Sequence, residues 1–450
     1  MKLVLLSCYE LGHQPLGLAL PLAFLERAGY HPVAQDLAVD RLDEALIRGA
    51  DFVGISVPMH TALRLGVRAA ARVRELNPDV HLCFFGLYAP LNATHLRASG
   101  ADSVLGGEHE AALVALVDGL ARGDRDAAAA PPVTLARLPF PRPQRRGLPP
   151  LERYAKLLRG DAAHVAGYAE TSRGCLHLCR HCPIPPVYGG RFFVVDAATV
   201  IADVAAQVEL GAAHITFGDP DFFNGPGHGM AIVRELHRRW PALTFDATIK
   251  ISHLLAHRGY LPELAALGCA FVVSAVESLD DGVLARLDKG HTRADVEQAL
   301  ALARAAGLVV RPTFVPFTPW TSLAQVADLI DFIEREELVD CVDPVQLSIR
   351  LLVPPGSLLL GPETGSAIGA LDPAALSHTW RHTDPSVDRL QQALAAVAAE
   401  AADGQLAPGL AFAQIRGLVH AACGRVRPAT LERSRLPRPP APRLSEPWFC

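Results

Sequence analysis

The chain alternates short apolar runs with amphipathic segments over most of its 450 residues, and this alternation constrains the fold more than any other feature. In the first 122 residues the predicted strands are Lys2–Ser7, His31–Asp36, Phe52–Ser56, His81–Phe85 and Ser103–Leu105. The predicted helices are Leu16–Ala28, Leu42–Gly49, Leu63–Leu76, Ala93–Gly100 and Glu108–Arg122. Repeated βα units form a parallel sheet with helices on both faces and hold ligands at the carboxyl ends of the strands. Residues 1–122 are therefore predicted to form an α/β binding domain of Rossmann type.

A second α/β period runs from about residue 161 to residue 357. The predicted strands are Val165–Glu170, His214–Phe217, Thr244–Ile251, Phe271–Val276, Val309–Phe317 and Val345–Leu352. Helical patterns such as Ala197–Leu210 and Arg293–Ala306 separate them. This region is predicted to contain six βα units, which makes it the larger of the two α/β domains.

The regions outside these two domains have a different composition. Residues 123–160 contain four consecutive alanines and a stretch rich in Pro and Arg, which predicts an extended linker with Arg142, Arg145 and Arg146 in solvent. Residues 358–424 are predicted to be helical, with helices near Pro385–Ala402 and Ala411–Cys423. Residues 425–450 form a tail dense in Pro and Arg.

Charge and cysteine content exclude several classes of protein. A net charge of −5 without a basic block argues against nucleic acid as a partner. Nine unevenly spaced cysteines are typical of cytosolic thiols with a metal site rather than of a disulfide framework. The first apolar run is too short for a signal peptide, and no apolar run reaches the length of a membrane span. We therefore expect a cytoplasmic protein without a membrane partner.

Three cysteines lie within eight residues, Cys175-Leu-His-Leu-Cys-Arg-His-Cys182. Their thiolates can converge on one metal centre but leave its fourth position open. A [4Fe–4S] cluster with one vacant iron fits that deficit, because a small chelating ligand can bind there and receive an electron. The alternative is a structural zinc site that recruits His177 or His181 as its fourth ligand.

The same stretch, led in by Thr171-Ser-Arg-Gly174, resembles the radical SAM superfamily, whose motif has this CxxxCxxC spacing. The resemblance implies that Cys175, Cys179 and Cys182 are the catalytic cluster ligands and that the open iron binds S-adenosyl-L-methionine. Reductive cleavage then gives a 5′-deoxyadenosyl radical, with electrons from an external donor such as flavodoxin or ferredoxin. It also implies that residues 161–357 form a partial (β/α)6 barrel with its catalytic residues at the carboxyl ends of the strands.

Loops after the second and third predicted barrel strands supply the first candidate cofactor contacts. Gly218-Asp-Pro-Asp221 occupies the position of the superfamily's Gly-Gly-Glu loop. This implies that Gly218 and Asp219 bind the ammonium group of S-adenosylmethionine, with Asp221 as the alternative; a simple turn is the other interpretation. Lys250 ends the third strand, where it either binds the cofactor carboxylate or extends toward solvent.

Two further blocks, Ser274-Ala-Val-Glu-Ser278 and Lys289-Gly-His-Thr292, resemble blocks common in cobalamin-type radical SAM proteins. Glu277 leaves an apolar strand, where a carboxylate is costly to bury without hydrogen-bond donors. We therefore expect Ser274 and Glu277 to contact the cofactor, with Glu277 accepting from the ribose hydroxyls. Arg350 is expected to pair with the cofactor carboxylate or with Glu277.

Loops of the N-terminal domain resemble the cobalamin-binding domain that precedes many radical SAM cores. The resemblance rests on Val53-Gly-Ile-Ser-Val57, Phe85-Gly86 and Gly106-Gly-Glu-His-Glu110. Small residues at such places let the backbone approach a bulky ligand. The implied cobalamin contacts are Ser56, Thr61, Gly86, Gly106 and Gly107.

The sequence departs from that family at two places. The Asp-x-His-x-x-Gly motif that supplies a cobalt-ligating histidine is absent, and the first loop offers only His13 at a different spacing. Leu87-Tyr88 stands where a second glycine is common. A degenerate Rossmann module that only docks on the core is therefore the alternative to a cobalamin domain.

The chain ends in Ser445-Glu-Pro-Trp-Phe-Cys450, which resembles the tail of the CUAEP/CCAEP-tail radical SAM family up to its first cysteine. We hypothesise that this tail folds back and places Cys450 at the barrel mouth as a redox or substrate-handling thiol.

These patterns together predict a radical SAM enzyme with cobalamin as a second cofactor. The predicted reaction is methyl transfer to an unactivated carbon of a small-molecule or peptide substrate. A second hypothesis keeps the radical SAM core but treats the N-terminal domain as vestigial, which implies non-methylating radical chemistry. The third is the non-catalytic iron–sulfur or zinc protein.

Overall fold

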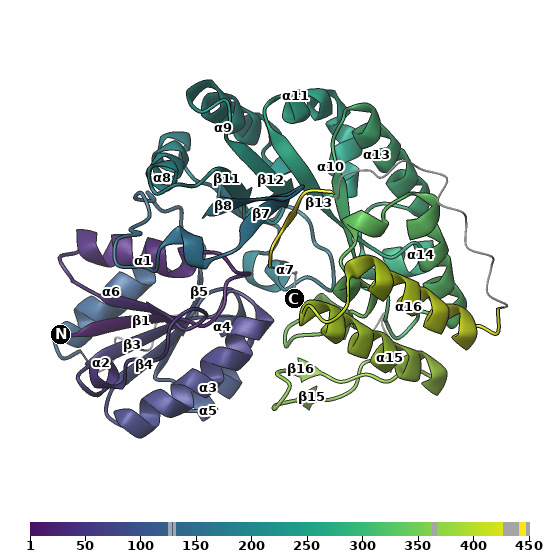
Figure 1. Cartoon of the computed structure of the whole chain (residues 1–450). Coiled ribbons are helices and arrows are strands. Elements are labelled where there is room, and N and C mark those ends of the chain that lie inside the picture. The colour runs from purple at the N-terminus through teal and green to yellow at the C-terminus, as the bar shows by residue number, and fades with distance from the viewer. Residues whose placement is uncertain (125–127, 129–131, 362–366, 426–440, 447–450) are drawn as a thin grey trace.

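The computed structural model describes residues 1–124, 128, 132–361, 367–425 and 441–446. An N-terminal α/β unit, a larger α/β unit and a pair of C-terminal helices pack beside one another (Figure 1). Within the described ranges, no helix combines the length and the apolar character that a bilayer span requires. The division of the chain at residues 122, 160, 357 and 424 stays a prediction.

The N-terminal sheet is parallel, with the strand order β2-β1-β3-β4-β5-β6. Its strands are β1 (Leu3–Ser7), β2 (Val33–Asp36), β3 (Phe52–Ser56), β4 (His81–Phe85), β5 (Ser103–Gly107) and β6 (Val133–Thr134). The first five lie where the sequence predicts strands, whereas β6 comes from the predicted linker and pairs with the end of β5. β1, β3 and β5 are buried along their whole length, as in a parallel sheet covered on both faces.

Helices cover both faces of this sheet (Figure 1). On one face, Leu18 and Leu22 of one helix meet Leu113 of another. On the other face, Leu63 and Val73 join the second core. The helices are α1 (Leu16–Arg27), α2 (Glu44–Arg48), α3 (His60–Leu76), α4 (Tyr88–Leu91), α5 (Ala93–Ala98) and α6 (Glu110–Ala121).

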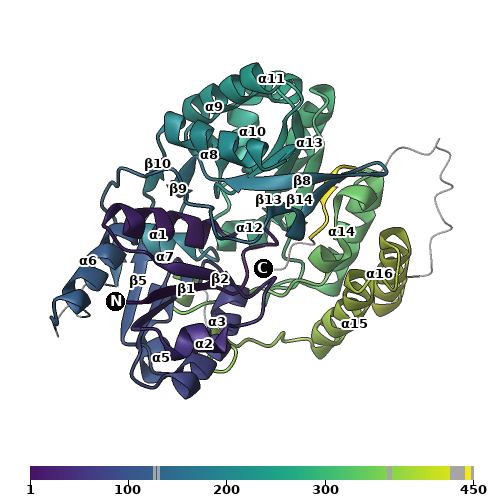
Figure 2. The ribbon, with the colours of Figure 1, turned by 60° about the vertical axis from the view of Figure 1, so that its left-hand side comes forward.

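The larger unit is built on a curled sheet with the strand order β14-β13-β12-β11-β8-β7-β17 (Figure 2). Its parallel strands are β8 (Ala162–Ala169), β11 (His214–Phe217), β12 (Thr244–Thr248), β13 (Cys269–Glu277) and β14 (Val310–Phe314). At the edge, β7 (Lys156–Arg159) and β17 (Arg443–Leu444) run antiparallel. The curled parallel sheet is the half-barrel expected from the sequence, although its predicted sixth strand is missing.

Helices follow the barrel strands, as the alternating pattern predicts. They are α8 (Ala197–Glu209), α9 (Pro226–Arg239), α10 (Ile251–Ala256), α11 (Leu261–Ala266), α12 (Asp281–Leu287), α13 (Arg293–Ala305) and α14 (Leu323–Arg335). Local sequence fixes several of their starts, because a side chain satisfies the free N–H groups of the first turn. Thr292 with Asp295 and Ser322 with Gln325 form capping boxes at α13 and α14.

The predicted sixth barrel strand, Val345–Leu352, was wrong. A short 3-10 helix, η6 (Pro344–Leu347), replaces its start, and a single bridge joins Arg350 to Phe317. Pro344 has no N–H to donate to a strand ladder. The side chain of Gln346 instead accepts from the backbone N–H of Phe314, at 3.2 Å, where a neighbouring strand would offer a carbonyl.

The prediction that Arg145 lies in solvent was also wrong. Arg145 is 6% exposed and binds Asp203 through two hydrogen bonds, of 2.7 and 2.8 Å. It also donates to the side chain of Gln14 and to the carbonyl of Tyr168. Composition predicts the surface path of the linker, but it does not reveal a buried carboxylate on α8 that lies far away in the sequence.

The C-terminal region packs against the open side of the half-barrel (Figure 1). The helices are α15 (Pro385–Ala402) and α16 (Pro408–Ala422), and β15 (Leu371–Asp372) pairs with β16 (Ser377–His378) in a small hairpin. After residue 441 the chain adds β17 to β7, and Glu446 accepts from the hydroxyl of Tyr9 at 3.0 Å. Cys450 lies outside the described residues.

Candidate functional site

The three motif cysteines lie in one loop between β9 (Ser172–Gly174) and α7 (Ile184–Tyr188). β9 pairs with β10 (Phe192–Val194), and Cys175 N donates to Arg191 O at 3.1 Å. Gly174 has φ +72°, and a β-carbon there would lie 2.4 Å from the same carbonyl, so only glycine fits. The loop closes further on through Cys182 N, which donates to Cys179 O at 3.2 Å.

The surroundings of these thiols favour a bound cation. Burial, together with the charges of Cys179 and Cys175, raises the pKa of Cys182 to about 12. The ammonium group of Lys289 is close enough to Cys179 and Cys182 to be stabilised by their charge. Thiolates that repel one another in a partly buried loop need a metal centre to remain deprotonated. The donor set therefore fits a three-thiolate metal centre.

The described residues contain a compact group of possible metal ligands, and the three thiols are not part of it. Thiolates on one tetrahedral zinc ion lie about 4 Å apart, because each Zn–S bond is about 2.3 Å long. Among the described residues, the group whose ligand atoms all lie within 4.8 Å of one another is His177, Asp221 and His253, and it does not include the thiols. The structure thus gives no support to the zinc alternative at the cysteines.

Asp219 is bonded within the protein rather than open to a ligand. It is 2% exposed and accepts from Thr171 N at 2.8 Å and from the hydroxyls of Thr171 and Ser172 at 2.6 Å. Burial raises the pKa of Asp219, although these hydrogen bonds act against that rise. The neighbouring Gly218 packs against Tyr168, whose hydroxyl would lie 1.8 Å from an added β-carbon. The two residues therefore hold the segment that leads into the cysteine loop.

Glu277 is a buried carboxylate with two cationic neighbours at the end of β13. His181 donates to it at 3.1 Å and Lys289 at 3.3 Å. Burial raises its pKa, but Lys289 and His181 outweigh that effect and hold the pKa at about 2. Glu277 also has φ +68°, a strained conformation for a non-glycine residue. Since His181 and Lys289 both lie beside the cysteines, Glu277 lies next to the cysteine loop.

Lys250 and Ser274 lie near the same end of the barrel. Lys250 is 8% exposed and precedes α10, and among the described residues no ion pair is found for its ammonium group. Ser274 is fully buried and donates to Ile249 O at 2.7 Å. A cation that pairs with no carboxylate of the chain is available to an anionic ligand, which makes Lys250 the better candidate of the two.

Arg350 does not take the position expected from the sequence. Its guanidinium group binds Asp388 at 2.5 Å, donates to Trp380 O and lies 3.5 Å from the centre of the Trp380 ring. The partners of Glu277 are His181 and Lys289 instead. The expected pairing of Arg350 with Glu277 was therefore wrong, because the C-terminal helical region supplies a carboxylate and an aromatic ring of its own.

A cavity of about 330 Å³ opens beside Glu277. It lies where β13 and β14 end, and polar groups dominate its wall. Besides Glu277 its charged and amide lining residues are Asp280, Asp281, Arg293, Gln325 and Asp328. This is a suitable place for a polar ligand beside Glu277.

In the N-terminal domain, the chain itself contacts the glycines expected to bind cobalamin. A β-carbon on Gly106 would lie 2.4 Å from Pro90, and one on Gly107 would lie 2.2 Å from Thr134 O. One on Gly86 would lie 3.2 Å from the backbone of Val57. The absence of side chains at these positions therefore serves internal packing.

The other expected contacts are partly or fully covered. Ser56 is 2% exposed, and its hydroxyl would lie 2.5 Å from a β-carbon on Gly17 of α1. Thr61 is half-buried in the first turn of α3. His13 is buried and stacks on Tyr168, with ring centres 4.7 Å apart, and burial lowers its pKa to about 4.

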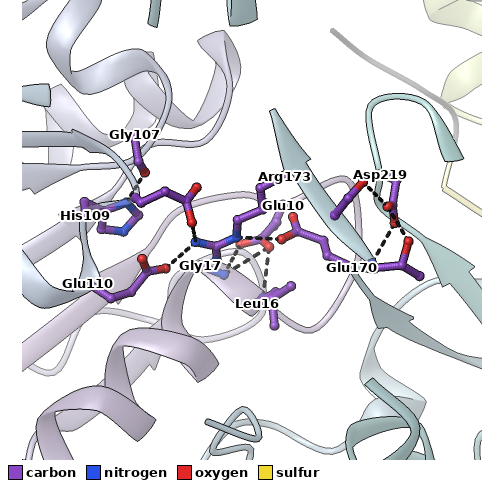
Figure 3. Close-up of polar contacts among 12 residues, drawn as sticks. Glu10, Leu16, Gly17, Gly107, His109, Glu110, Glu170, Arg173 and Asp219 are labelled. Atoms are coloured by element: carbon purple, nitrogen blue, oxygen red, sulfur yellow. Dashed lines mark hydrogen bonds and ion pairs between the residues drawn. The ribbon is translucent and has the colours of Figure 1, made fainter. Parts of the chain in front are cut away.

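Charged side chains fill the junction between the N-terminal domain and the cysteine loop (Figure 3). Arg173 lies 2.6 Å from Glu110, 3.0 Å from Glu170 and 3.9 Å from Glu108. Glu10 accepts from Leu16 N and Gly17 N at the start of α1. Burial raises the pKa of Glu108 to about 7 and that of Glu10 to about 8. We call Glu10, Glu108, Glu110, Glu170 and Arg173 the junction cluster.

The junction cluster occupies the part of the N-terminal domain where cobalamin is expected to bind. It lies at the carboxyl ends of β1 and β5, where a Rossmann-type domain holds its ligand. Tyr188 of α7 donates to Glu108 at 3.0 Å, and α7 packs against α4 and β5. The segment after the cysteine loop therefore lies against the edge of the sheet on which a Rossmann-type domain holds its ligand.

The sequence interpretation gave no role to the junction cluster or to His253. Two signals were available, since Gly106–Glu110 carries two acidic residues and Arg173 lies inside the lead-in to the cysteines. A charged residue next to a buried motif needs a partner, and Glu170, three residues before Arg173, is the nearest one in the sequence.

Comparison with known proteins agrees with this geometry. Residues 169–333 match the model of the Radical SAM superfamily, so this stretch is a radical SAM domain. A protein from Methanocaldococcus jannaschii that is named as a methylthiotransferase is 26% identical over 162 residues. That match covers 33% of this chain and 34% of the relative, so the chain aligns with about a third of its length.

Solved structures extend the similarity beyond the radical SAM domain. The methyltransferase TsrM from Kitasatospora setae, with cobalamin and a [4Fe-4S] cluster bound, has a TM-score of 0.60 and 19% identity over 75% of this chain and 71% of its own. The cobalamin-dependent enzyme OxsB with aqua-cobalamin has a TM-score of 0.65 and 15% identity over 87% of this chain and 66% of its own. These likenesses show a shared fold.

Proposed function

We propose that the chain is a radical SAM enzyme whose [4Fe–4S] cluster is held by Cys175, Cys179 and Cys182. The observation that carries the proposal is the loop of three thiols beside the buried pair of Lys289 and Glu277, within a matched radical SAM domain. When bound, such a cluster supplies the electron that breaks a carbon–sulfur bond of S-adenosylmethionine and yields a 5′-deoxyadenosyl radical. The proposed partners are an external donor such as flavodoxin or ferredoxin and a small-molecule or peptide substrate.

The chain's own residues are proposed to position the cofactor. Lys250, a buried cation with no ion pair among the described residues, binds the cofactor carboxylate. Glu277, kept ionised by Lys289, accepts from the ribose hydroxyls beside the cavity. Gly218 and Asp219 keep the lead-in to the cysteine loop in place through Tyr168 and Thr171.

The test is anaerobic reconstitution of the full chain with iron and sulfide. We expect about four irons per chain and, with a strong reductant, formation of 5′-deoxyadenosine from S-adenosylmethionine. Cys182→Ala should abolish both. Cys341→Ala is the matched control, because Cys341 lies in η5 (Val339–Cys341) on another part of the barrel. Unchanged cleavage in Cys182→Ala would exclude the proposal.

Two proposals for the N-terminal domain can be separated by experiment. The packing of α7 on β5 and the junction cluster favour a domain that docks on the core without a corrinoid, with non-methylating radical chemistry. The fold shared with cobalamin-containing TsrM and OxsB favours cobalamin-dependent methyl transfer as the second candidate. Protein purified from cells supplied with cobalamin should lack a corrinoid absorption spectrum under the first proposal and show about one equivalent under the second.

A further inference from the structure

Three side chains from three separate segments of the chain converge at the cysteine loop. His177 comes from the cysteine loop itself, Asp221 from the loop after β11, and His253 from α10. Asp221 Oδ2 lies 2.7 Å from His253 Nδ1 and 3.4 Å from His177 Nε2. One ligand atom from each residue lies within 4.8 Å of the other two.

Asp221 pairs closely with both histidines, but none of the three atoms forms a hydrogen bond of normal geometry. His177 Nε2, Asp221 Oδ2 and His253 Nδ1 are each buried and, among the described residues, lack a hydrogen-bond partner of normal geometry. A contact of 2.7 Å without hydrogen-bond alignment means that the lone pairs are not aimed at each other's protons. Two imidazole nitrogens and a carboxylate oxygen that are this close together, buried and without a normal hydrogen bond form a suitable donor set for one metal ion.

The rest of Asp221 is already held in place. Its Oδ1 accepts from Phe223 N at 3.1 Å, which fixes the carboxylate and leaves Oδ2 for a ligand. The side chain of Asp221 is 3% exposed, so water does not readily satisfy that oxygen. A buried carboxylate oxygen between two imidazoles is the chemistry of a metal site rather than of a surface acidic patch.

We propose that His177, Asp221 and His253 bind one divalent transition-metal ion, Zn²⁺ or Fe²⁺. Two imidazoles and a carboxylate suit these ions, whereas Mg²⁺ and Ca²⁺ prefer oxygen ligands alone. Bonds of about 2.0 to 2.2 Å place neighbouring ligand atoms about 3 to 3.5 Å apart, close to the contacts of Asp221. Three protein ligands leave a further position for water or another small ligand.

The ion is separate from the proposed cluster but linked to it through the chain. His177 stands between Cys175 and Cys179, whereas Asp221 follows β11 and His253 lies in α10 after β12. Asn224, at the end of η3 (Phe222–Asn224), accepts from Leu176 N at 3.3 Å and connects the same two loops. A bound ion would therefore pin the cysteine loop to the carboxyl ends of β11 and β12.

The test uses the reconstituted full chain, in which the cluster occupies the thiols. After treatment with a chelator, Co²⁺ is titrated under anaerobic conditions as a spectroscopic substitute for Zn²⁺ or Fe²⁺. We expect one equivalent to bind with ligand-field absorption bands and without the intense charge-transfer band of cobalt–thiolate bonds. Bound Zn²⁺ should also raise the unfolding temperature, because an ion that binds only the folded state stabilises it.

His253→Gln should weaken Co²⁺ binding by at least tenfold and remove the Zn²⁺ effect on the unfolding temperature. His257→Gln is the matched control, because His257 lies one turn later at the end of α10, beside His253 but outside the group of three. Cluster absorption should be retained in both variants, which separates loss of the ion from loss of the cluster.

Two outcomes would overturn the proposal. One is Co²⁺ binding that is absent in the parent protein or equal in His253→Gln and the parent. The other is a variant Asp221→Asn that loses S-adenosylmethionine binding while metal content stays unchanged, which would assign Asp221 to the ammonium group instead.

Discussion

Arg173 Nη1 lies 2.6 Å from Glu110 Oε1, and this contact joins the lead-in of the cysteine loop to the first turn of α6. Arg173 is 12% exposed and Glu110 is fully buried as side chains, so neither charge is solvated in the usual way. One arginine is therefore the shared counter-charge of three nearby carboxylates at the junction between the two α/β units. The position of the cysteine loop depends on that balance of charge.

Arg173→Met should lower the free energy of unfolding by about 3 to 5 kcal/mol, because it leaves buried carboxylates without their counter-charge. Urea denaturation followed by circular dichroism measures the change. Arg238→Met is the control, because Arg238 pairs with Glu235 at the surface, where solvent screens the interaction. Equal effects of the two substitutions would show that the junction cluster does not stabilise the fold.

The raised pKa of Glu10 predicts that stability falls as pH rises toward 8. Burial raises the folded-state pKa from 4.5 to about 8, so between these values the folded state keeps a proton that the unfolded state has lost. The slope from this group is at most about 1.4 kcal/mol per pH unit. Glu10→Gln keeps an acceptor for Leu16 N and should flatten the trend.

The contribution of Glu10 to the pH dependence of stability is best measured between pH 6.5 and 8. Buried histidines such as His13, whose pKa falls to about 4, contribute the opposite trend, but only below their ordinary value of 6.5. Unfolding free energies of parent and Glu10→Gln are compared at several pH values. Parallel curves from pH 6.5 to 8 would show that Glu10 is ionised in the folded state.

Local sequence patterns predicted the strands well but not their long-range partners. Five N-terminal strands and five barrel strands lie where apolar runs end in small or polar residues. The cysteine loop was equally visible because its ligands are adjacent in sequence. The failures share a cause: Arg145 pairs with Asp203 and Arg350 with Asp388, and no local pattern encodes which distant carboxylate meets a given arginine.

The missing sixth strand has a different cause. The run from Val345 to Leu352 is apolar enough for a strand, but Pro344 and the Gln346 side chain divert the backbone into η6. At the N-terminal domain, the glycines at 86, 106 and 107 were visible in sequence, but the sequence did not show that Pro90, Thr134 and Val57 pack against them. A glycine is needed both where another part of the chain packs against the backbone and where a ligand does, so the sequence alone does not distinguish the two cases.

Lys250→Met should weaken binding of S-adenosylmethionine by about tenfold or more, because a hydrogen bond to a charged group contributes about 1.5 to 3 kcal/mol. Lys250 is buried at the start of α10 and has no competing ion pair among the described residues. Isothermal titration calorimetry on the reconstituted protein measures the dissociation constant. An unchanged value would remove Lys250 from the cofactor site.

Arg350→Met separates the cofactor site from the C-terminal contact. The guanidinium group binds Asp388 and stacks on Trp380, so its removal should lower the free energy of unfolding by about 1 to 3 kcal/mol through lost hydrogen bonds and the cation–π contact. The dissociation constant for S-adenosylmethionine should stay within about twofold of the parent value, in contrast to Lys250→Met. A tenfold loss of affinity with unchanged stability would instead show that Arg350 binds the carboxylate of S-adenosylmethionine. Arg350 would then have to leave Asp388 and Trp380 when the cofactor binds.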